Sequence, residues 1–411
     1  MKRLFLAATA ICASLFALPA FGQSAPIVDI MEQSVRTSPA YLAADADLGR
    51  AAAAADRIAA GPYEFEVNAS GGQRKIDNPL ASDESYTEWS AGVARTVRLP
   101  KKREADYGLA RIENELARAS LDQVLQAERR HFAMLWSAWR QAELMQETSS
   151  VQADEARRIA ELEQVAVDKG AQRQIRADQL AAEAGLLFLQ AEQDRNAAEA
   201  ARAALVARYP DTPFPERAFA LDWSDENLQQ VLAAPLDQTP AYRKSRLEAE
   251  QAQLRARRTR MDALPDPTLG LDFGNEFGGS ETSLMARITI PIGGSARRAY
   301  SREMSANATV AELNRVGVER ETYQAVEAAR VSLRASLSMY ETALATAAAS
   351  EKYLGTMRKG YELSEITITE FLNSRRSTIA AERAVAEQRA KVESDLLTLM
   401  VMTGSLAETD G

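Results

Sequence analysis

The chain has 411 residues, with 49 Lys and Arg against 58 Asp and Glu and a formal net charge of −9, and this acidic balance argues against a nucleic-acid partner. Its only cysteine and only histidine are Cys12 and His131, so the usual zinc ligand sets are unavailable. No Gly-rich phosphate loop and no nucleophile elbow is present. We therefore expect no enzymatic activity, no catalytic residue, no cofactor and no metal site.

Residues 1–22 have the pattern of a secretory signal peptide. Lys2 and Arg3 precede an apolar run over residues 4–18, and small residues precede the expected cut. A membrane anchor is the alternative, but the run is too short to span a bilayer. Cys12 would leave with the signal peptide. It lies inside the apolar run and not at the cut, so we expect no lipid attachment.

A short phrase occurs twice, as SPAY at Ser38–Tyr41 and as TPAY at Thr239–Tyr242. In each copy a Ser or Thr followed by Pro begins a helix-forming run. The segments that follow also match, which indicates an internal duplication. The predicted parts are a signal peptide over 1–22, a first repeat over 23–208, a proline-rich connector over 209–238, a second repeat over 239–404 and a C-terminal tail over 405–411.

After each predicted helix, apolar and polar residues alternate with the period of a β-strand. Each repeat has two such runs joined by a polar loop, and each run is about ten residues long, the length of a tilted strand in an outer membrane. The alternative is a pair of exposed hairpins in a periplasmic protein. The apolar positions expected to form the membrane strands are Tyr63, Phe65, Val67, Trp89, Val93, Leu269, Leu271, Phe273, Leu284, Ile288 and Ile290.

Basic residues follow the predicted strands directly. They lie at Lys101–Arg103 in the first repeat and at Arg297–Arg298 in the second. Lys and Arg side chains can reach water and phosphate from the edge of a bilayer. We therefore expect both stretches at the inner boundary between membrane and water.

Two very long helical segments follow, because no proline occurs over 101–207 or over 295–403. Gly170 and Gly360 lie near the middle of each segment, where a helix can turn back. Apolar residues recur every seven positions from Leu333 to Tyr361, the period of a coiled-coil seam. The sequence predicts two antiparallel helical hairpins, with an ordinary amphipathic bundle as the alternative.

Four strands per chain cannot close into a barrel, and an open edge in lipid leaves unpaired backbone groups that cost several kcal/mol each. Three chains together would close twelve strands. The helices are too polar for lipid, so they would continue the tube into the periplasm. The expected fold class is α+β, mostly α: an internally duplicated chain with four membrane β-strands and long coiled-coil helices, forming a trimer with a twelve-stranded barrel and a helical periplasmic tunnel.

The order of elements, the duplication and the segments PDPTLGLDFG and SLMARITIPIGGSARR resemble the TolC-type outer-membrane efflux family. The second segment and the phrase LPDPTLGLDF are most similar to its heavy-metal branch, the CzcC/CusC-like proteins. This resemblance implies a homotrimer in the outer membrane of a Gram-negative bacterium, with a periplasmic extension. It also implies a periplasmic adaptor (membrane fusion) protein and an inner-membrane pump of the RND or ABC type as partners.

The resemblance also implies a pore gate at the helical turns. The family carries a Tyr-x-x-Gly motif there, followed by acidic residues that point into the closed pore. Three Glu370 carboxylates around a trimer axis would attract cations, whereas the alternative is a solvated Glu370 paired with Arg376. In the second repeat Tyr361 and Glu370 match the motif, whereas Ser364 replaces its glycine and the uncharged Asn373 stands at the second acidic position. In the first repeat Gly170 keeps the glycine, and Arg176 stands where the family often has an acidic residue.

The function expected from these features is an exit duct of a tripartite efflux system. The branch resemblance favours export of heavy-metal cations with an RND-type pump and an adaptor. A duct of the same fold for multidrug efflux or type I protein secretion is the main alternative. A periplasmic coiled-coil adaptor is a further alternative, but an adaptor has one helical hairpin and no duplication.

Overall fold

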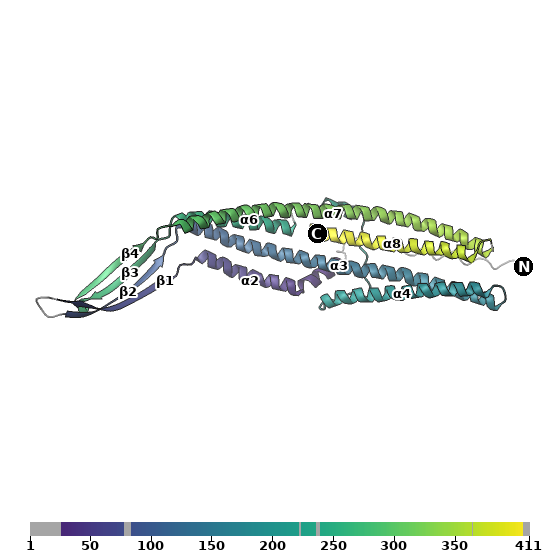
Figure 1. Ribbon diagram of the computed structural model, residues 1–411, viewed down its shortest axis with the longest axis horizontal. Helices are drawn as coiled ribbons and strands as arrows, with labels where there is room; N and C mark the ends of the chain where they lie inside the picture. Colours follow the sequence, from purple (N-terminus) through teal and green to yellow (C-terminus); the bar gives the residue numbers. More distant parts are fainter. Residues whose placement is uncertain (1–25, 78–83, 222, 236–238, 364, 406–411) are drawn as a thin grey trace.

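The computed structural model describes residues 26–77, 84–221, 223–235, 239–363 and 365–405. The molecule is a long rod with a β-sheet at one end and helices along the rest of its length (Figure 1). The helices are α1 (Pro26–Arg36), α2 (Pro39–Ala60), α3 (Pro100–Asp168), α4 (Gln174–Arg208), α5 (Asp225–Ala233), α6 (Pro240–Arg260), α7 (Ser295–Glu362) and α8 (Ile368–Thr403). The strands are β1 (Phe65–Ile76), β2 (Glu84–Thr96), β3 (Thr268–Glu276) and β4 (Glu281–Thr289), and the short 3-10 helices are η1 (Met261–Ala263) and η2 (Phe277–Gly279). The predicted signal peptide lies outside the described residues.

The two halves of the rod have the same plan. Each contains one very long helix, α3 with 69 residues or α7 with 68, which is about 100 Å at the usual rise per residue. Two shorter helices lie end to end along each of these: α2 and α4 along α3, and α6 and α8 along α7 (Figure 1). Contacts of α3 with α6 and α8 join the halves. In the described part of the chain, no helix is both long and apolar enough to cross a membrane.

The predicted antiparallel hairpins are present in both halves. Gly170 has a φ of 73° and ends α3, because a left-handed conformation stops the helix at little cost only for glycine. Gly360 lies in the last turn of α7, and the chain reverses just after it. A Cβ atom at Gly360 would lie 3.4 Å from the Ile366 side chain, so the second turn packs closely against the end of α7.

The repeated phrase begins equivalent helices, as expected. Ser38 precedes α2, and its hydroxyl accepts a hydrogen bond of 3.2 Å from the Tyr41 N–H. Thr239 precedes α6 with the same extended backbone, and Pro is the first helical residue in both cases. The two copies therefore differ only in the cap: the Thr239 side chain makes no capping hydrogen bond.

The main hydrophobic core lies near the middle of the rod. Phe132, Trp136 and Trp139 of α3 are each at most 1% exposed. Phe132 stacks on Trp136 at 5.8 Å between ring centroids, and Trp136 meets Trp139 edge to face at 5.2 Å. α1, the connector after α4, and the end of α8 cover this aromatic group with Met31, Tyr209 and Leu397. The core therefore holds α1 and α8 against the longest helix, and the indoles serve packing.

The strands form one antiparallel sheet in the order β1-β2-β3-β4. β2 pairs with β3, so the sheet joins the two halves of the chain in the register Asn68–Gly92–Asp272. Within the described residues, β1 and β4 each keep one edge without a partner strand.

Two predicted strand positions are wrong. Tyr63 precedes β1, and its hydroxyl donates a hydrogen bond to Asp266, beyond the sheet. Ile290 follows β4 and precedes Pro291, which has no N–H with which to continue the ladder. The other predicted positions lie within the four strands.

Candidate functional site

The two faces of the sheet differ in chemistry. One face carries the predicted apolar side chains, which are well exposed in the single chain; Val67, Leu284 and Ile288 are 82%, 75% and 68% exposed. The opposite face carries the intervening residues, and these are mostly polar or small. A strand with one apolar and one polar face suits a boundary between lipid and water.

A polar cluster crosses all four strands on that opposite face. Asp272 of β3 is 7% exposed and accepts hydrogen bonds from Asn68 of β1, at 3.0 Å, and from Arg287 of β4. The carboxylate lies over Gly92 of β2, where an added Cβ would be only 2.1 Å from the Asp272 Oδ1. The glycine therefore makes room for the carboxylate. This cluster was not predicted from the sequence, although its members occupy the alternate positions of the predicted strands.

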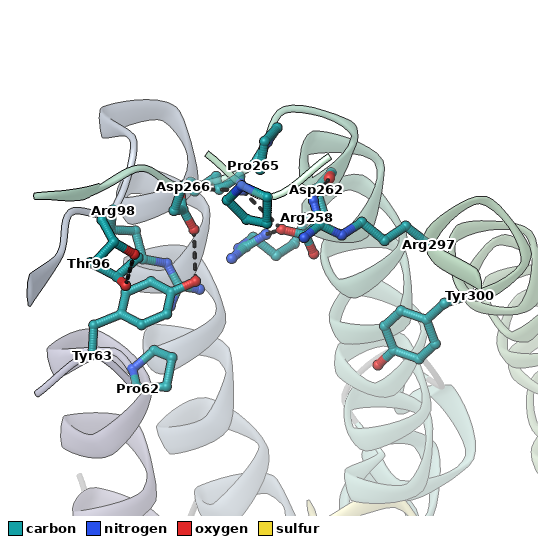
Figure 2. Close-up of a pocket in the computed structure, with 13 residues that line it drawn as sticks. Pro62, Tyr63, Thr96, Arg98, Arg258, Asp262, Pro265, Asp266, Arg297 and Tyr300 are labelled. Atoms are coloured by element: carbon teal, nitrogen blue, oxygen red, sulfur yellow. Dashed lines mark hydrogen bonds and ion pairs between the residues drawn. The ribbon is translucent and has the colours of Figure 1, made fainter. Parts of the chain in front are cut away.

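The junction between sheet and helices centres on Asp266, in the segment before β3 (Figure 2). Its carboxylate accepts hydrogen bonds from the Tyr63 hydroxyl at 2.9 Å and the Leu99 N–H at 3.1 Å, and it pairs with Lys102 at 3.2 Å. Burial alone would raise the pKa of Asp266, but these partners outweigh it and hold the pKa below its usual value. Asp266 is therefore a fixed anion at the point where β1, α3 and β3 meet.

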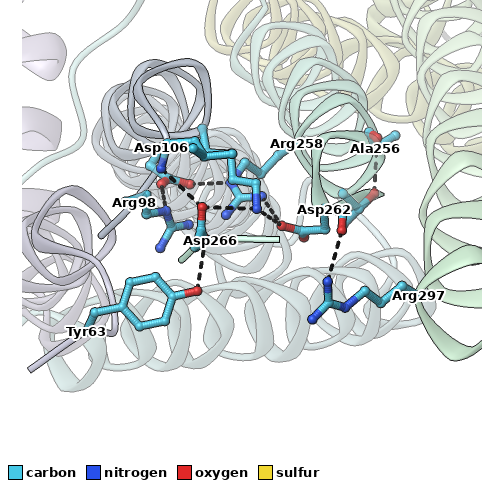
Figure 3. A network of polar contacts seen from close by, with 11 residues as sticks. Tyr63, Arg98, Asp106, Ala256, Arg258, Asp262, Asp266 and Arg297 are labelled. Carbon is cyan, nitrogen blue, oxygen red and sulfur yellow. Dashed lines mark hydrogen bonds and ion pairs between the residues drawn. The ribbon is translucent and has the colours of Figure 1, made fainter. Parts of the chain in front are cut away.

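A second group of charges lies beside this junction, where Figure 3 shows Arg98, Asp106, Arg258 and Asp262 close together. Arg258 of α6 pairs with Asp106 of α3 at 2.8 Å and with Asp262 at 2.7 Å. Arg98 adds a contact of 2.6 Å to the other oxygen of Asp106. These pairs fasten the end of α6 to the start of α3, beside a pocket of about 400 Å³.

The basic stretch at Lys101–Arg103 does not behave as one unit. Lys101 and Arg103 are exposed, as expected for side chains that reach water. Lys102 is 2% exposed and pairs with Asp262 and Asp266, so the expectation that its side chain reaches water is wrong. The cause is helical geometry, which turns every third or fourth side chain toward the neighbouring helix.

At the far end of the rod, Tyr361 joins four helices. Arg176 of α4 donates a hydrogen bond of 2.8 Å from Nε to the Tyr361 hydroxyl and lies 3.1 Å from Glu163 of α3. The Tyr361 ring stacks on Phe371 of α8 at 5.0 Å between centroids. Burial raises the pKa of Tyr361 against the opposing effect of Arg176. Glu163 and Phe371 were not singled out from the sequence.

Glu370 lies in the first turn of α8 and caps it. Its carboxylate accepts hydrogen bonds from the Thr367 N–H at 2.7 Å and the Thr367 hydroxyl at 2.8 Å, and that hydroxyl accepts from the Glu370 N–H. The bond from the Thr367 N–H is the main reason why the pKa of Glu370 lies below its usual value. The side chain is exposed, but the alternative pairing with Arg376 is absent: Arg376 binds Glu183.

The structure thus brings only some of the predicted gate residues together. Tyr361 and Arg176 are in contact. Glu370 and Asn373 lie separately, on an exposed part of α8. Gly170 forms the other turn, and Ser364 lies outside the described residues. The described residues contain no cluster of acidic, His or Cys side chains that fits a metal ion.

Neither a protein-family model nor a curated protein matches the sequence, but solved structures match the fold. The CmeC outer membrane channel of Campylobacter jejuni is similar at a TM-score of 0.71 and 14% identity, over 94% of this chain and 87% of that chain. The outer membrane protein VceC of Vibrio cholerae is similar at a TM-score of 0.73 and 17% identity, over 92% and 96%. The fold is that of TolC-type outer-membrane channels. These neighbours are channels and not enzymes.

CusC is a further neighbour with the TolC-type fold, at a TM-score of 0.72 and 13% identity, over 94% of this chain and 95% of that chain. CmeC and VceC match about equally well. The comparison therefore supports the fold and does not single out the heavy-metal branch.

Proposed function

We propose that this chain is the exit duct of a tripartite efflux system. Three copies would form a barrel in the outer membrane of a Gram-negative bacterium, with the helices extending into the periplasm. The observation that carries the proposal is the sheet at the end of the rod, which has one apolar face, one polar face and, within the described residues, two edges without partners. The apolar face would contact lipid and the polar face would line water.

The free edges support a trimer in particular. Unpaired backbone groups in lipid cost several kcal/mol each, so a membrane sheet has to close on itself. β1 of one copy can pair with β4 of the next, and three copies would give twelve strands, more than the smallest barrels contain. The same ring would place three sets of helices around one axis below the barrel.

We infer that the helical turns form the gate of this duct. In a trimer the exposed Glu370 and Asn373 side chains would face the axis, and the contact between Tyr361 and Arg176 would hold the two hairpin ends of each copy together. Gly170 and Ser364 would shape the turns. The support is the match of Tyr361, Glu370 and Gly170 to the family motif and the contacts around Tyr361.

For cargo, we propose heavy-metal cations, moved by an RND-type pump through a periplasmic adaptor protein. The support is the sequence resemblance to the heavy-metal branch and the acidic balance of the chain. Multidrug efflux or type I protein secretion is the second candidate, because a duct of this fold touches its cargo loosely. Growth of a strain that lacks this protein distinguishes the two candidates for the cargo. Sensitivity to copper, silver, zinc, cobalt or cadmium supports metal export, whereas sensitivity to organic drugs alone contradicts it.

The deciding experiment for the duct is the mass of the protein extracted from the outer-membrane fraction, measured by light scattering with the detergent subtracted. We expect a trimer in that fraction. A soluble periplasmic monomer would contradict the proposal.

Two matched substitutions test the faces of the sheet. Leu271 and Met285 are 54% and 55% exposed and lie on the apolar and polar faces respectively. Leu271→Asn should block trimer assembly, because it puts an amide into lipid, whereas Met285→Asn should assemble normally. Equal behaviour of the two variants would contradict the assignment of the faces.

A further inference from the structure

Arg375 of α8 is a buried charge that forms no ion pair with any described residue. The residue is 3% exposed. Its two terminal nitrogens are inaccessible to solvent and have no hydrogen-bond partner among the described residues. Burial lowers the pKa of the guanidinium, but arginine stays protonated in proteins. A charge held out of water without compensation destabilises the packing that holds it.

Carboxylates lie near Arg375, but each already has another partner. Their charges attract the guanidinium, with Glu155 as the strongest and Glu183 next. The existing pairs are Glu155 with Arg358 at 3.1 Å, Glu183 with Arg376 at 2.9 Å, and Glu382 with Gln152 at 2.8 Å. Arg375 therefore has no carboxylate of its own among the described residues, at the place where α3, α4, α7 and α8 meet.

A second copy of the chain cannot supply the missing partner, because the two nitrogens are already covered within one chain. A carboxylate of the same chain could reach Arg375 only through a movement inside the chain. Glu155 and Glu183 belong to the hairpin of α3 and α4, whereas Arg375 belongs to the hairpin of α7 and α8. A shift of one hairpin against the other changes the distance between Arg375 and these carboxylates.

Glu155 is the carboxylate that can be released more easily. Its side chain is 49% exposed and that of Arg358 is 48% exposed, and exposed ion pairs contribute little. Glu183 is 6% exposed and pairs with Arg376 through two hydrogen bonds. Breaking this pair would leave the buried Glu183 carboxylate without the Arg376 guanidinium.

We propose that Arg375 is a switch residue of the gate, unpaired in the arrangement described and paired with Glu155 when the hairpins shift. The unpaired charge raises the free energy of the described arrangement and so favours the shifted one. The proposal rests on the proposed function, because it takes the hairpin ends to be the gate of the duct.

The first test compares two arginines on one helix by thermal unfolding of the purified trimer. Arg375→Met removes the unpaired charge, and we expect the melting temperature to rise by about 2 °C or more. Arg383→Met is the control: Arg383 pairs with Asp194 at 2.8 Å, so its loss should lower the melting temperature. A fall for Arg375→Met as well would mean that Arg375 has a partner in the folded protein, such as a buried water, and would overturn the proposal.

The second test measures opening in planar bilayers. Arg375→Met and Glu155→Gln should each reduce the frequency of opening several-fold, and the double variant should be no worse than either. Glu155 is at the surface, so its variant should fold. Wild-type opening frequency in both variants would overturn the switch. Absence of any current from the wild-type trimer would instead contradict the duct, and the melting comparison would still test the unpaired charge.

Discussion

The guanidinium of Arg176 lies over the ring of Tyr361, with 4.3 Å from its central carbon to the ring centroid, and also donates a hydrogen bond of 2.8 Å to the tyrosine hydroxyl. The two residues are 185 positions apart in the sequence. Arg176 is in the first turn of α4 and Tyr361 is in the last turn of α7. One side-chain contact therefore couples the ends of the two hairpins.

Tyr361→Phe should weaken this coupling without removing the ring. The variant keeps the cation–π contact and the stacking on Phe371, but it loses the hydrogen bond from Arg176. We expect a loss of about 1 kcal/mol in the free energy of unfolding and a larger open fraction in bilayers. Tyr353→Phe on the same helix is the control, because Tyr353 is 55% exposed and should change neither quantity. An equal open fraction in the two variants would argue against a role of the Tyr361 hydroxyl in the gate.

The strands and hairpins could be predicted because their signals are local. Alternating apolar and polar residues predicted the strands, and long runs without proline predicted the helices. The contact between Arg176 and Tyr361 has no such signal, since it depends on how two hairpins pack. Arg176 attracted notice only because it stands at a position where an acidic residue was expected.

One part of the candidate site had a local signal that our sequence analysis did not use. Thr367 and Glu370 form the Thr-x-x-Glu pattern of a capping box just before a helix, and the structure contains both of its hydrogen bonds. The pattern explains why Glu370 bends back toward its own backbone and not toward Arg376. The burial of Arg375 could not be predicted from the sequence. The adjacent residue, Arg376, is of the same type, yet 57% of the Arg376 side chain is exposed.

Gly92→Ala should disrupt the sheet. The new methyl group would lie 2.1 Å from the Asp272 carboxylate, so the bonds of Asp272 to Asn68 and Arg287 would have to shift. Such overpacking costs about 1–3 kcal/mol, and we expect less trimer in the outer-membrane fraction. Gly72→Ala is the control, because nothing lies within 4 Å of a Cβ at Gly72. The role assigned to Gly92 is wrong if both variants assemble equally.

Lys102→Met should destabilise the junction between sheet and helices. It leaves Asp266, which is 6% exposed, without its cationic partner, although the bonds from Tyr63 and Leu99 remain. Breaking a buried pair in this way costs about 3 kcal/mol, measurable as a lower urea midpoint. Lys101→Met changes the exposed neighbour and should stay within about 0.5 kcal/mol of the wild type. A similar small effect for Lys102→Met would show that Asp266 does not need the ammonium group.

Variants of Thr367 and Glu370 separate two roles of Glu370, as cap and as pore charge. Thr367→Ala and Glu370→Ala both break the capping box, but only Glu370→Ala removes the carboxylate. If the carboxylates face the pore, Glu370→Ala should lower the preference for cations in bilayer recordings, and Thr367→Ala should keep it. Equal cation preference in all three proteins would remove Glu370 from the gate and leave it as a cap.

The cap itself should depend on pH. Because the Thr367 N–H lowers the pKa of Glu370 below the unfolded value of 4.5, the ionised carboxylate stabilises the folded chain at pH values above 4.5. This contribution is lost as the pH falls through the folded pKa. The melting temperatures of the wild type and Glu370→Gln should therefore differ at pH 7 and converge in acid. A constant difference at all pH values would mean that the charge of the carboxylate plays no part in the cap.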